Sequence, residues 1–150
     1  ALLLGCANVL AATGSGEPSC AKNFIVLRKG PATSFPVSWR AARYMPFFRH
    51  EAKGAWVRVT DLEGESHWAQ PRDLTSAYPC VAVKAMVATL RKEPTLAAPP
   101  ADLKTVDRYT PLKKLETQGE WVKIEDETGR RAWIHESNIW KPMKVQSVKF

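Results

Sequence analysis

The sequence lacks the patterns that most often carry catalysis or metal binding. It contains no Cys-x-x-Cys or His-x-x-x-His pair, and its three histidines are scattered, so no zinc site is expected. It contains no glycine-rich phosphate loop, and Glu125 and Asp126 belong to a turn and its flank rather than to an acid–base pair. We therefore expect a protein that is not an enzyme and that has no metal or cofactor.

Helical periodicity is also missing, because no helical pattern of apolar residues extends beyond one turn. Short alternating segments separated by turns take its place. The clearest are Glu120–Glu125 and Arg130–His135, which flank the turn Asp126–Gly129. Five such strands in about sixty residues favour a small all-β barrel.

The N-terminal apolar run, Ala1–Ala12, is too short to span a bilayer. Small and polar residues follow it, as in the h-region and cleavage zone of a secretory signal, although no initiator Met or basic segment precedes it. We expect residues 1–21 to be a signal peptide and leader, cleaved after Ala11 or Gly14, and the mature protein to be exported to the periplasm or cell envelope. An ordinary buried strand or helix is the alternative.

Leu3–Cys6 also resembles a bacterial lipoprotein box, in which Cys6 would be lipidated and become the first residue of the mature chain. The apolar residues that follow Cys6 weigh against this alternative, because a lipoprotein usually turns polar there. Association with a membrane is expected only if Cys6 is lipidated.

The chain contains an internal repeat. Aligning Arg43–Trp68 with Arg108–Trp133 gives ten identities in twenty-six positions without a gap. The identical pairs are Arg43/Arg108, Tyr44/Tyr109, Pro46/Pro111, Glu51/Glu116, Gly54/Gly119, Trp56/Trp121, Val57/Val122, Asp61/Asp126, Gly64/Gly129 and Trp68/Trp133. We expect two domains, at residues 22–78 and 79–141, and a basic tail at residues 142–150.

Two further expectations follow from aligning the copies. The alignment needs one gap, of two residues, which we place in the proline-bearing loop after Leu90. Arg43–His50 and its equivalent in the second copy each contain a proline and are expected to form exposed strands.

Positive charge is spread evenly over both copies, and the chain has a net charge of +7. Acidic residues are interspersed throughout, which is typical of a solubilising surface rather than a nucleic-acid-binding arm. The charge still favours anionic partners such as phospholipid headgroups or acidic wall polymers. Nucleic-acid binding through the basic surface and six tryptophans is an alternative, against which the secretory signal argues.

Three segments resemble bacterial SH3 (Src homology 3) domains. Val26–Val37 is similar to their loop N-V-R-S-G-P-S-T-S-Y-P-V, and Gly119–Ile124 followed by Ala132–Ile139 is similar to their G-W-x-K-V and G-W-V-H-x-S-x-L motifs. The resemblance covers residues 24–140, in two copies. It implies two SH3-like barrels in an envelope-exposed protein that binds cell-wall peptides or other proteins without catalysis.

Both copies depart from the relatives that bind proline-rich peptides. Those relatives use a Trp together with a Pro and a Tyr in the closing turn. The last two positions here hold Gln70 and Asp73 in the first copy, and His135 and Asn138 in the second. The aromatic slot for a polyproline helix is therefore incomplete, and PxxP recognition is not expected.

The candidate ligand-binding residues lie mainly on the Trp strand of each copy. Because Val57 and Val122 alternate with their neighbours, a core-facing valine directs the preceding Trp outward, beside a cation. Such a Trp binds ligands by stacking, apolar contact and charge. The candidates are Trp56, Arg58, Trp121, Lys123, Tyr44 and Tyr109. The alternative is that each Trp packs on the neighbouring barrel or on its own proline loop.

The other four tryptophans divide into two pairs. Trp68 and Trp133 are expected to be structural, because this pattern places them on the flank of the barrel. Trp39 and Trp140 have no equivalent in the other copy and are expected to serve either interdomain packing or ligand contact.

Cys20 and Cys80 are expected to form a disulfide. Cys20 precedes the first strand of the first copy and Cys80 follows its closing turn, and the chain ends of a closed barrel of this type lie near each other. The exported compartment is oxidising, and the third cysteine, Cys6, lies in the leader. Two unpaired thiols are the alternative.

We therefore expect a non-catalytic binding or scaffold module of the bacterial cell envelope, with a cell-wall peptide or an envelope protein as its partner. An accessory subunit that works by docking on an envelope enzyme is the alternative.

Overall fold

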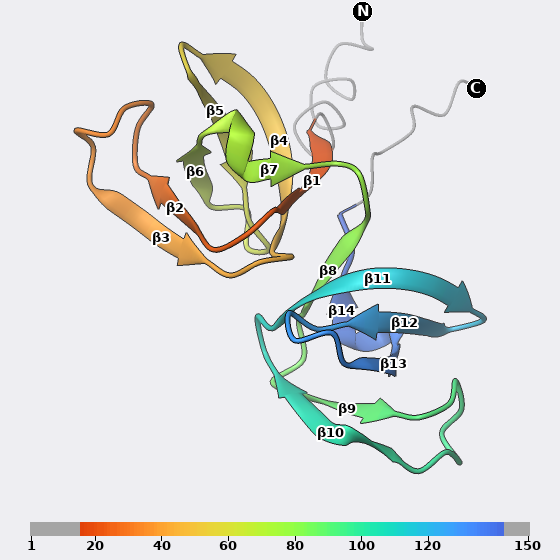
Figure 1. Ribbon diagram of the computed structural model, residues 1–150. Helices are drawn as coiled ribbons and strands as arrows, with labels where there is room; N and C mark the ends of the chain where they lie inside the picture. The colour runs from red at the N-terminus through yellow and green to blue at the C-terminus, as the bar shows by residue number, and fades with distance from the viewer. Residues whose placement is uncertain (1–15, 143–150) are drawn as a thin grey trace, which may run out of the picture.

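The computed structural model describes residues 16–142, which form two seven-stranded antiparallel sheets, each curled into a small barrel (Figure 1). In the first sheet, β1 (Glu17–Ala21), β2 (Ile25–Arg28), β3 (Val37–Ala41), β4 (Pro46–Lys53), β5 (Trp56–Thr60), β6 (Ser66–Ala69) and β7 (Leu74–Thr75) follow the order β3-β2-β6-β5-β4-β1-β7. In the second, β8 (Cys80–Val83), β9 (Val87–Arg91), β10 (Pro100–Asp107), β11 (Pro111–Gln118), β12 (Trp121–Glu125), β13 (Arg131–His135) and β14 (Ile139–Trp140) follow the order β10-β9-β13-β12-β11-β8-β14. The all-β class and the tandem barrels expected from the sequence are confirmed.

The described part of the chain contains two helical elements, the single 3₁₀ turns η1 (Pro71–Asp73) and η2 (Glu136–Asn138). Each stands where the sequence predicted a short closing turn. No helix within residues 16–142 is long and apolar enough to cross a membrane.

Each barrel has seven strands rather than about five. The two-residue strands β7 and β14 are too short to show a hydrophobic period, and β1 lies in the segment that the sequence assigned to the leader. β1 pairs with β4 and β7, and its last residue, Ala21, is fully buried. The first barrel therefore includes Glu17–Ala21, and Cys20 lies within a strand rather than before one.

The alternation that predicted β5 and β12 is present in the structure. Val57 and Val59 are buried in the first core, and Val122 and Ile124 are buried in the second. Each pair is two residues apart, so both members point to the same side of the sheet.

The expectation that β4 and β11 are exposed strands is wrong. Phe47 and Leu112, the second residues of these strands, are fully buried. Pro46 and Pro111 stand at the first position of each strand, where proline is tolerated in a sheet. Each proline marks the start of a strand. The residues later in each strand are mostly polar and exposed, so the sequence does not show that the start of the strand is buried.

The two extra residues of the second copy lie in a strand and not in a loop. Arg28 pairs with Val37 and Arg91 pairs with Pro100, so the β2–β3 and β9–β10 connections have equal length. The insertion is taken up in β10, between Pro100 and Thr105, where the register of the pairing shifts. The expected position of the gap is therefore wrong by a few residues.

The neighbouring side chain explains why Glu93 replaces Gly30 at the equivalent position of this loop. A Cβ atom on Gly30 would lie 2.4 Å from the ring of Phe35. The second copy has Ala98 where the first has Phe35, so the ring that excludes a side chain is absent there.

Strand β8 lies between the barrels, and both of its faces are covered (Figure 1). Val81 and Val83 point into the second core, whereas Ala82, of opposite parity, packs with the first core. Trp140 pairs with Ala82 and lies edge-on against Phe48 of the first barrel, with ring centroids 5.9 Å apart. Trp140 is thus an interdomain contact, and the two barrels pack directly on each other.

Candidate binding site at the junction of the barrels

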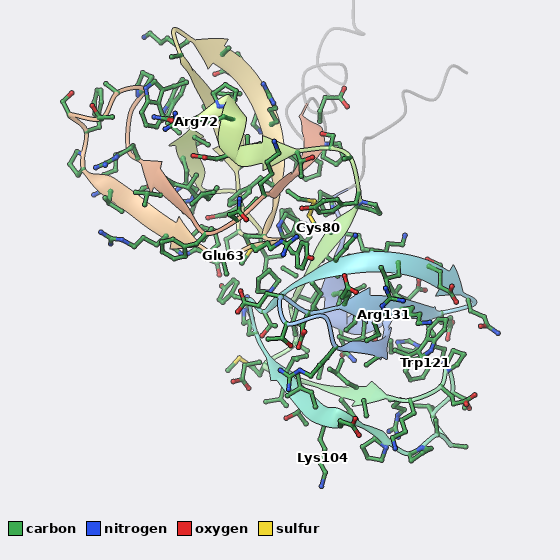
Figure 2. The ribbon with its side chains drawn as sticks, in the orientation of Figure 1. Glu63, Arg72, Cys80, Lys104, Trp121 and Arg131 are labelled. Carbon is green, nitrogen blue, oxygen red and sulfur yellow. A yellow bond between two sulfur atoms is a disulfide. The ribbon has the colours of Figure 1, made fainter. Side chains whose placement is uncertain are left out.

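A disulfide links the first strand of one barrel to the first strand of the other. Cys20 in β1 is bonded to Cys80 in β8, and their Cα atoms lie 6.1 Å apart. This is the pairing expected from the sequence, and Figure 2 shows Cys80 between the barrels. Tyr44 and Tyr78 pack beside the disulfide, with ring centroids 5.7 Å apart in an edge-to-face arrangement. The connection between the barrels is therefore held by a covalent bond and by aromatic packing.

Tyr44 and Tyr109 occupy equivalent positions and share an uncommon backbone conformation. Their φ angles are 73° and 71°, in the left-handed region that residues other than glycine rarely adopt. The guanidinium groups of Arg43 and Arg108 lie over the two rings, 4.7 and 5.1 Å from the centroids. Tyr44 is buried, whereas Tyr109 is 36% exposed. Of the two candidate tyrosines, Tyr109 is the one that a ligand can reach.

Tyr109 extends across the junction to the first barrel. Its hydroxyl donates a hydrogen bond to Oε1 of Glu63, in the turn Asp61–Gly64. Nη2 of Arg108 lies 3.6 Å from the same oxygen. Glu63 stands at the side of the first barrel that faces the second (Figure 2), so the tyrosine and the arginine of one barrel contact a turn of the other.

Asp61 fixes the conformation of this turn. Its Oδ1 accepts hydrogen bonds from the backbone N–H groups of Glu63 and Glu65, at 2.9 and 3.0 Å, and its Oδ2 lies 2.7 Å from Nε2 of His67. Burial alone would raise the pKa of the Asp61 carboxyl, but the hydrogen bonds from His67 and the two backbone groups outweigh burial and lower the pKa. Asp61 is therefore a carboxylate at neutral pH.

His67 connects the turn to strand β3. The ring is buried, and its Nδ1 lies 2.7 Å from Oγ of Ser38 while Nε2 faces Asp61. A neutral His67 with its proton on Nε2 satisfies both contacts, because it accepts from the Ser38 hydroxyl and donates to Asp61. This network could not be expected from the repeat, since the second copy has Ala132 at the position of His67.

The same order of groups occurs in serine hydrolases, where backbone N–H groups face the oxyanion, and in the α/β-hydrolases among them a sharp turn presents the serine. Ser38 lies instead within strand β3. We therefore interpret the Ser38–His67–Asp61 network as structural, with the role of holding the turn and the strand together.

A cavity of about 350 Å³ opens where these groups meet, and we call it the junction cavity. Its lining includes Trp39, Asp61, Leu62, Glu63 and His67 of the first barrel and Tyr109 of the second. The Trp39 ring packs against Phe47 and His67, at centroid distances of 5.9 and 5.7 Å, so it is held in place by the core. Trp39 therefore serves packing within its own barrel and also forms one wall of a cavity to which both barrels contribute.

Trp56 and Trp121 are not the partly exposed residues that alternation suggested. They are only 8% and 9% exposed, and Trp121 packs edge-on against His135 with centroids 5.2 Å apart. Alternation predicts the face of a sheet on which a side chain lies, but it does not predict whether other side chains cover that face. The expected exposure is therefore wrong, and neither indole offers an open face to a ligand.

The two candidate cations also have partners within the protein. Arg58 donates two hydrogen bonds to Glu51, at 2.7 and 3.1 Å, and this contact lowers the pKa of Glu51 to about 2. Lys123 places its Nζ 5.9 Å from the ring centroid of Trp133 rather than beside Trp121. Trp133 is buried, in agreement with the structural role expected for it.

Some expectations concern residues that the structure does not describe. The proposed cleavage sites, the lipidation site at Cys6 and most of the basic tail lie outside residues 16–142. Within residues 16–142, no group of three or more His, Cys, Asp or Glu side chains is placed to hold a metal ion.

Comparison with known proteins identifies the family. The sequence pattern of the bacterial SH3 domain matches residues 21–75 and again residues 84–141. The chain belongs to the bacterial SH3 domain family. A search of curated proteins found no match. Among solved structures, an NlpC/P60 family protein from Bacillus cereus is similar, with 15% identity and a TM-score of 0.39 over 83% of this chain. This chain spans 57% of the length of that protein.

Proposed function

We propose that this bacterial SH3 protein is a non-catalytic binding module of the cell envelope and that it holds a cell-wall peptide in the junction cavity. The observation that carries the proposal is the composition of the cavity. Its walls come from both barrels, with Trp39 and Glu63 from the first and Tyr109 from the second. Concave sites with aromatic walls and a few placed polar groups are the usual form of a ligand site, and interdomain junctions are a usual place for them.

The rigidity of the junction supports binding. The Cys20–Cys80 disulfide and the Trp140–Phe48 contact hold the barrels together, and the Asp61 hydrogen bonds hold the turn that carries Glu63. A site whose walls are already fixed loses less conformational entropy when a ligand binds than one that must assemble around it.

Export to the envelope is part of this proposal. A structural disulfide is typical of oxidising compartments, and the apolar segment at Ala1–Ala12 has the composition of a secretory signal. An exported module of the bacterial SH3 family meets cell-wall peptides directly.

Retention of the full chain on purified peptidoglycan tests the proposal, with an envelope extract as the second arm. We expect retention on peptidoglycan, and we expect Tyr109→Ala to weaken it. Phe24→Ala is the matched control, because Phe24 is an exposed aromatic outside the cavity lining. Capture of an envelope protein without retention on peptidoglycan would instead identify an accessory subunit, and equal retention of Tyr109→Ala and the parent would place the ligand elsewhere.

A further inference from the structure

The junction cavity differs in charge from the rest of this basic protein. The chain has 22 Lys and Arg residues against 15 Asp and Glu. The cavity nevertheless has two carboxylates, Asp61 and Glu63, in its lining, and no Lys or Arg is among the described residues that line it. Its walls also present two aromatic rings, those of Trp39 and Tyr109.

We propose that the junction cavity recognises a primary ammonium group carried on an apolar arm, such as the amino group of a diamino-acid side chain in a peptide. This inference rests on the proposed function and names the part of the peptide that the cavity takes. An ammonium group is attracted to the faces of aromatic rings and forms charge-assisted hydrogen bonds with carboxylates. The apolar arm would lie against Leu62 and the Trp39 ring, which form the apolar part of the lining.

The contacts of Glu63 with the described residues involve one of its two carboxylate oxygens. Tyr109 and Arg108 both contact Oε1, and no hydrogen bond from a described residue reaches Oε2. Arg108 offsets part of the charge of Glu63, because its Nη2 lies 3.6 Å away. Asp61 supplies a second negative charge, because a neutral His67 hydrogen-bonds its Oδ2 without cancelling the charge and no Lys or Arg of the described residues forms an ion pair with it.

The second barrel provides an internal comparison. It has a smaller cavity, of about 130 Å³, beside Asp126, the residue equivalent to Asp61. Arg130 and Arg131 line that cavity, and Nε of Arg130 lies 2.8 Å from Oδ2 of Asp126. The carboxylate of Asp126 is therefore already paired with an arginine of the protein. In the junction cavity the aspartate contacts His67 instead of an arginine. Of the two cavities, it is therefore the one that can attract a cationic group of a ligand.

A titration with small probes tests this inference directly. The probes are N-acetyl-lysine methylamide, its Nε-acetylated form and N-acetyl-glutamate methylamide, added to ¹⁵N-labelled full chain. We expect saturable shifts of the Trp39 indole N–H and of the Leu62 and Glu63 amides with the ammonium probe. The acetylated probe should bind about tenfold more weakly or worse, and the glutamate probe should cause no saturable shift.

Two matched variants assign the effect to the cavity. Glu63→Gln removes the carboxylate of the cavity lining that has one oxygen without a hydrogen bond from the described residues, and we expect it to weaken binding of the ammonium probe about two- to fivefold, as for an exposed ion pair. Glu127→Gln makes the same change at an exposed position in the equivalent turn of the second barrel and should leave binding unchanged. Equal shifts with the free and acetylated lysine probes, or equal weakening by the two variants, would overturn the inference.

The outcome is separable from that of the proposed function. Retention on peptidoglycan with no preference for the ammonium probe would support the proposed binding function and contradict recognition of an ammonium group. Saturable binding of the ammonium probe without retention on peptidoglycan would support the ammonium site and show that its natural ligand is not a cell-wall peptide.

Discussion

The hydroxyl of Tyr109, in the second barrel, donates a hydrogen bond to the carboxylate of Glu63, in the first. Burial raises the pKa of Tyr44, the equivalent residue of the first barrel, and the negative charges of Glu125 and Asp126 in the second barrel add to the shift although Arg43 opposes it. The two tyrosines differ in their surroundings, because Tyr44 is covered by Tyr78 and the disulfide whereas Tyr109 lines a cavity.

Because of this difference, we expect the same substitution to reduce stability at one position and ligand binding at the other. Tyr44→Ala removes a buried aromatic ring beside the disulfide, and we expect it to lower the free energy of unfolding by about 3 kcal/mol. Tyr109→Ala removes a partly exposed ring and should cost little stability while it weakens ligand binding. Urea unfolding followed by circular dichroism compares the two. Equal stability losses would show that both rings are structural.

The disulfide is expected to contribute to stability through the loop that it closes. Cys20 and Cys80 are 60 residues apart, for which the chain-entropy model gives at most about 4 kcal/mol. Reduction of the parent should lower its melting temperature, whereas the variant with both cysteines changed to serine should melt lower and be insensitive to reductant. Thiol labelling of non-reduced protein checks the bond itself, and labelling at both positions in protein purified from the periplasm would contradict it.

The buried tryptophans are expected to be structural. Trp56→Ala and Trp121→Ala should each cost about 3–5 kcal/mol, as removal of a buried Trp typically does. Trp133→Ala is the comparison, because Trp133 is equally buried. Thermal melts of the three variants decide the matter. A parent-like melt for Trp121→Ala, combined with lost retention on peptidoglycan, would restore that residue as a ligand contact.

The two turn aspartates predict a loss of stability in acid. Hydrogen bonds outweigh burial at Asp61 and Asp126, so the pKa of each carboxyl is lowered in the folded protein. A carboxyl whose folded pKa lies below its unfolded value stabilises the fold above the unfolded pKa, near pH 4, and this contribution is lost as the pH falls through the folded pKa. Stability should therefore fall progressively below about pH 4.

Substitution of the same aspartates tests that assignment. Asp61→Asn and Asp126→Asn should each lose about 1.5–3 kcal/mol at pH 7, the contribution of hydrogen bonds to a charged group, and should flatten the dependence of stability on pH below pH 4. Asp107→Asn, at an exposed position in β10, is the control and should retain the parent's dependence. An unchanged slope in both turn variants would mean that other carboxyls cause the acid sensitivity.

The sequence was sufficient to predict the repeat, the all-β class and the strands on either side of each Asp–Gly turn. Those strands carry the period of two with buried residues such as Val122 and Ile124, which is the strongest signal a half-buried strand gives. The pairing of Cys20 with Cys80 followed from the short distance between the chain ends of a closed barrel. Strand β1 was missed, because five residues that include a proline and a serine carry no such period.

The candidate site was less predictable, and the reason is physical. Alternation predicted the face of the sheet for Trp56 and Trp121, but both side chains are buried on that face. The junction cavity depends on Tyr109 reaching Glu63, a contact between residues 46 positions apart in different domains. No pattern within one copy of the repeat encodes how two copies pack, so Tyr109 was a candidate without a predicted partner.

An NMR titration of the full chain with soluble peptides released from peptidoglycan tests whether the junction cavity binds a cell-wall peptide. We expect saturable shifts that centre on the junction cavity, at the Trp39 indole N–H and the amides of Leu62, Glu63 and Tyr109, and that are weakened in Glu63→Gln but not in Glu127→Gln. Shifts that centre instead on β12 around Trp121, or the absence of any saturable shift, would contradict it.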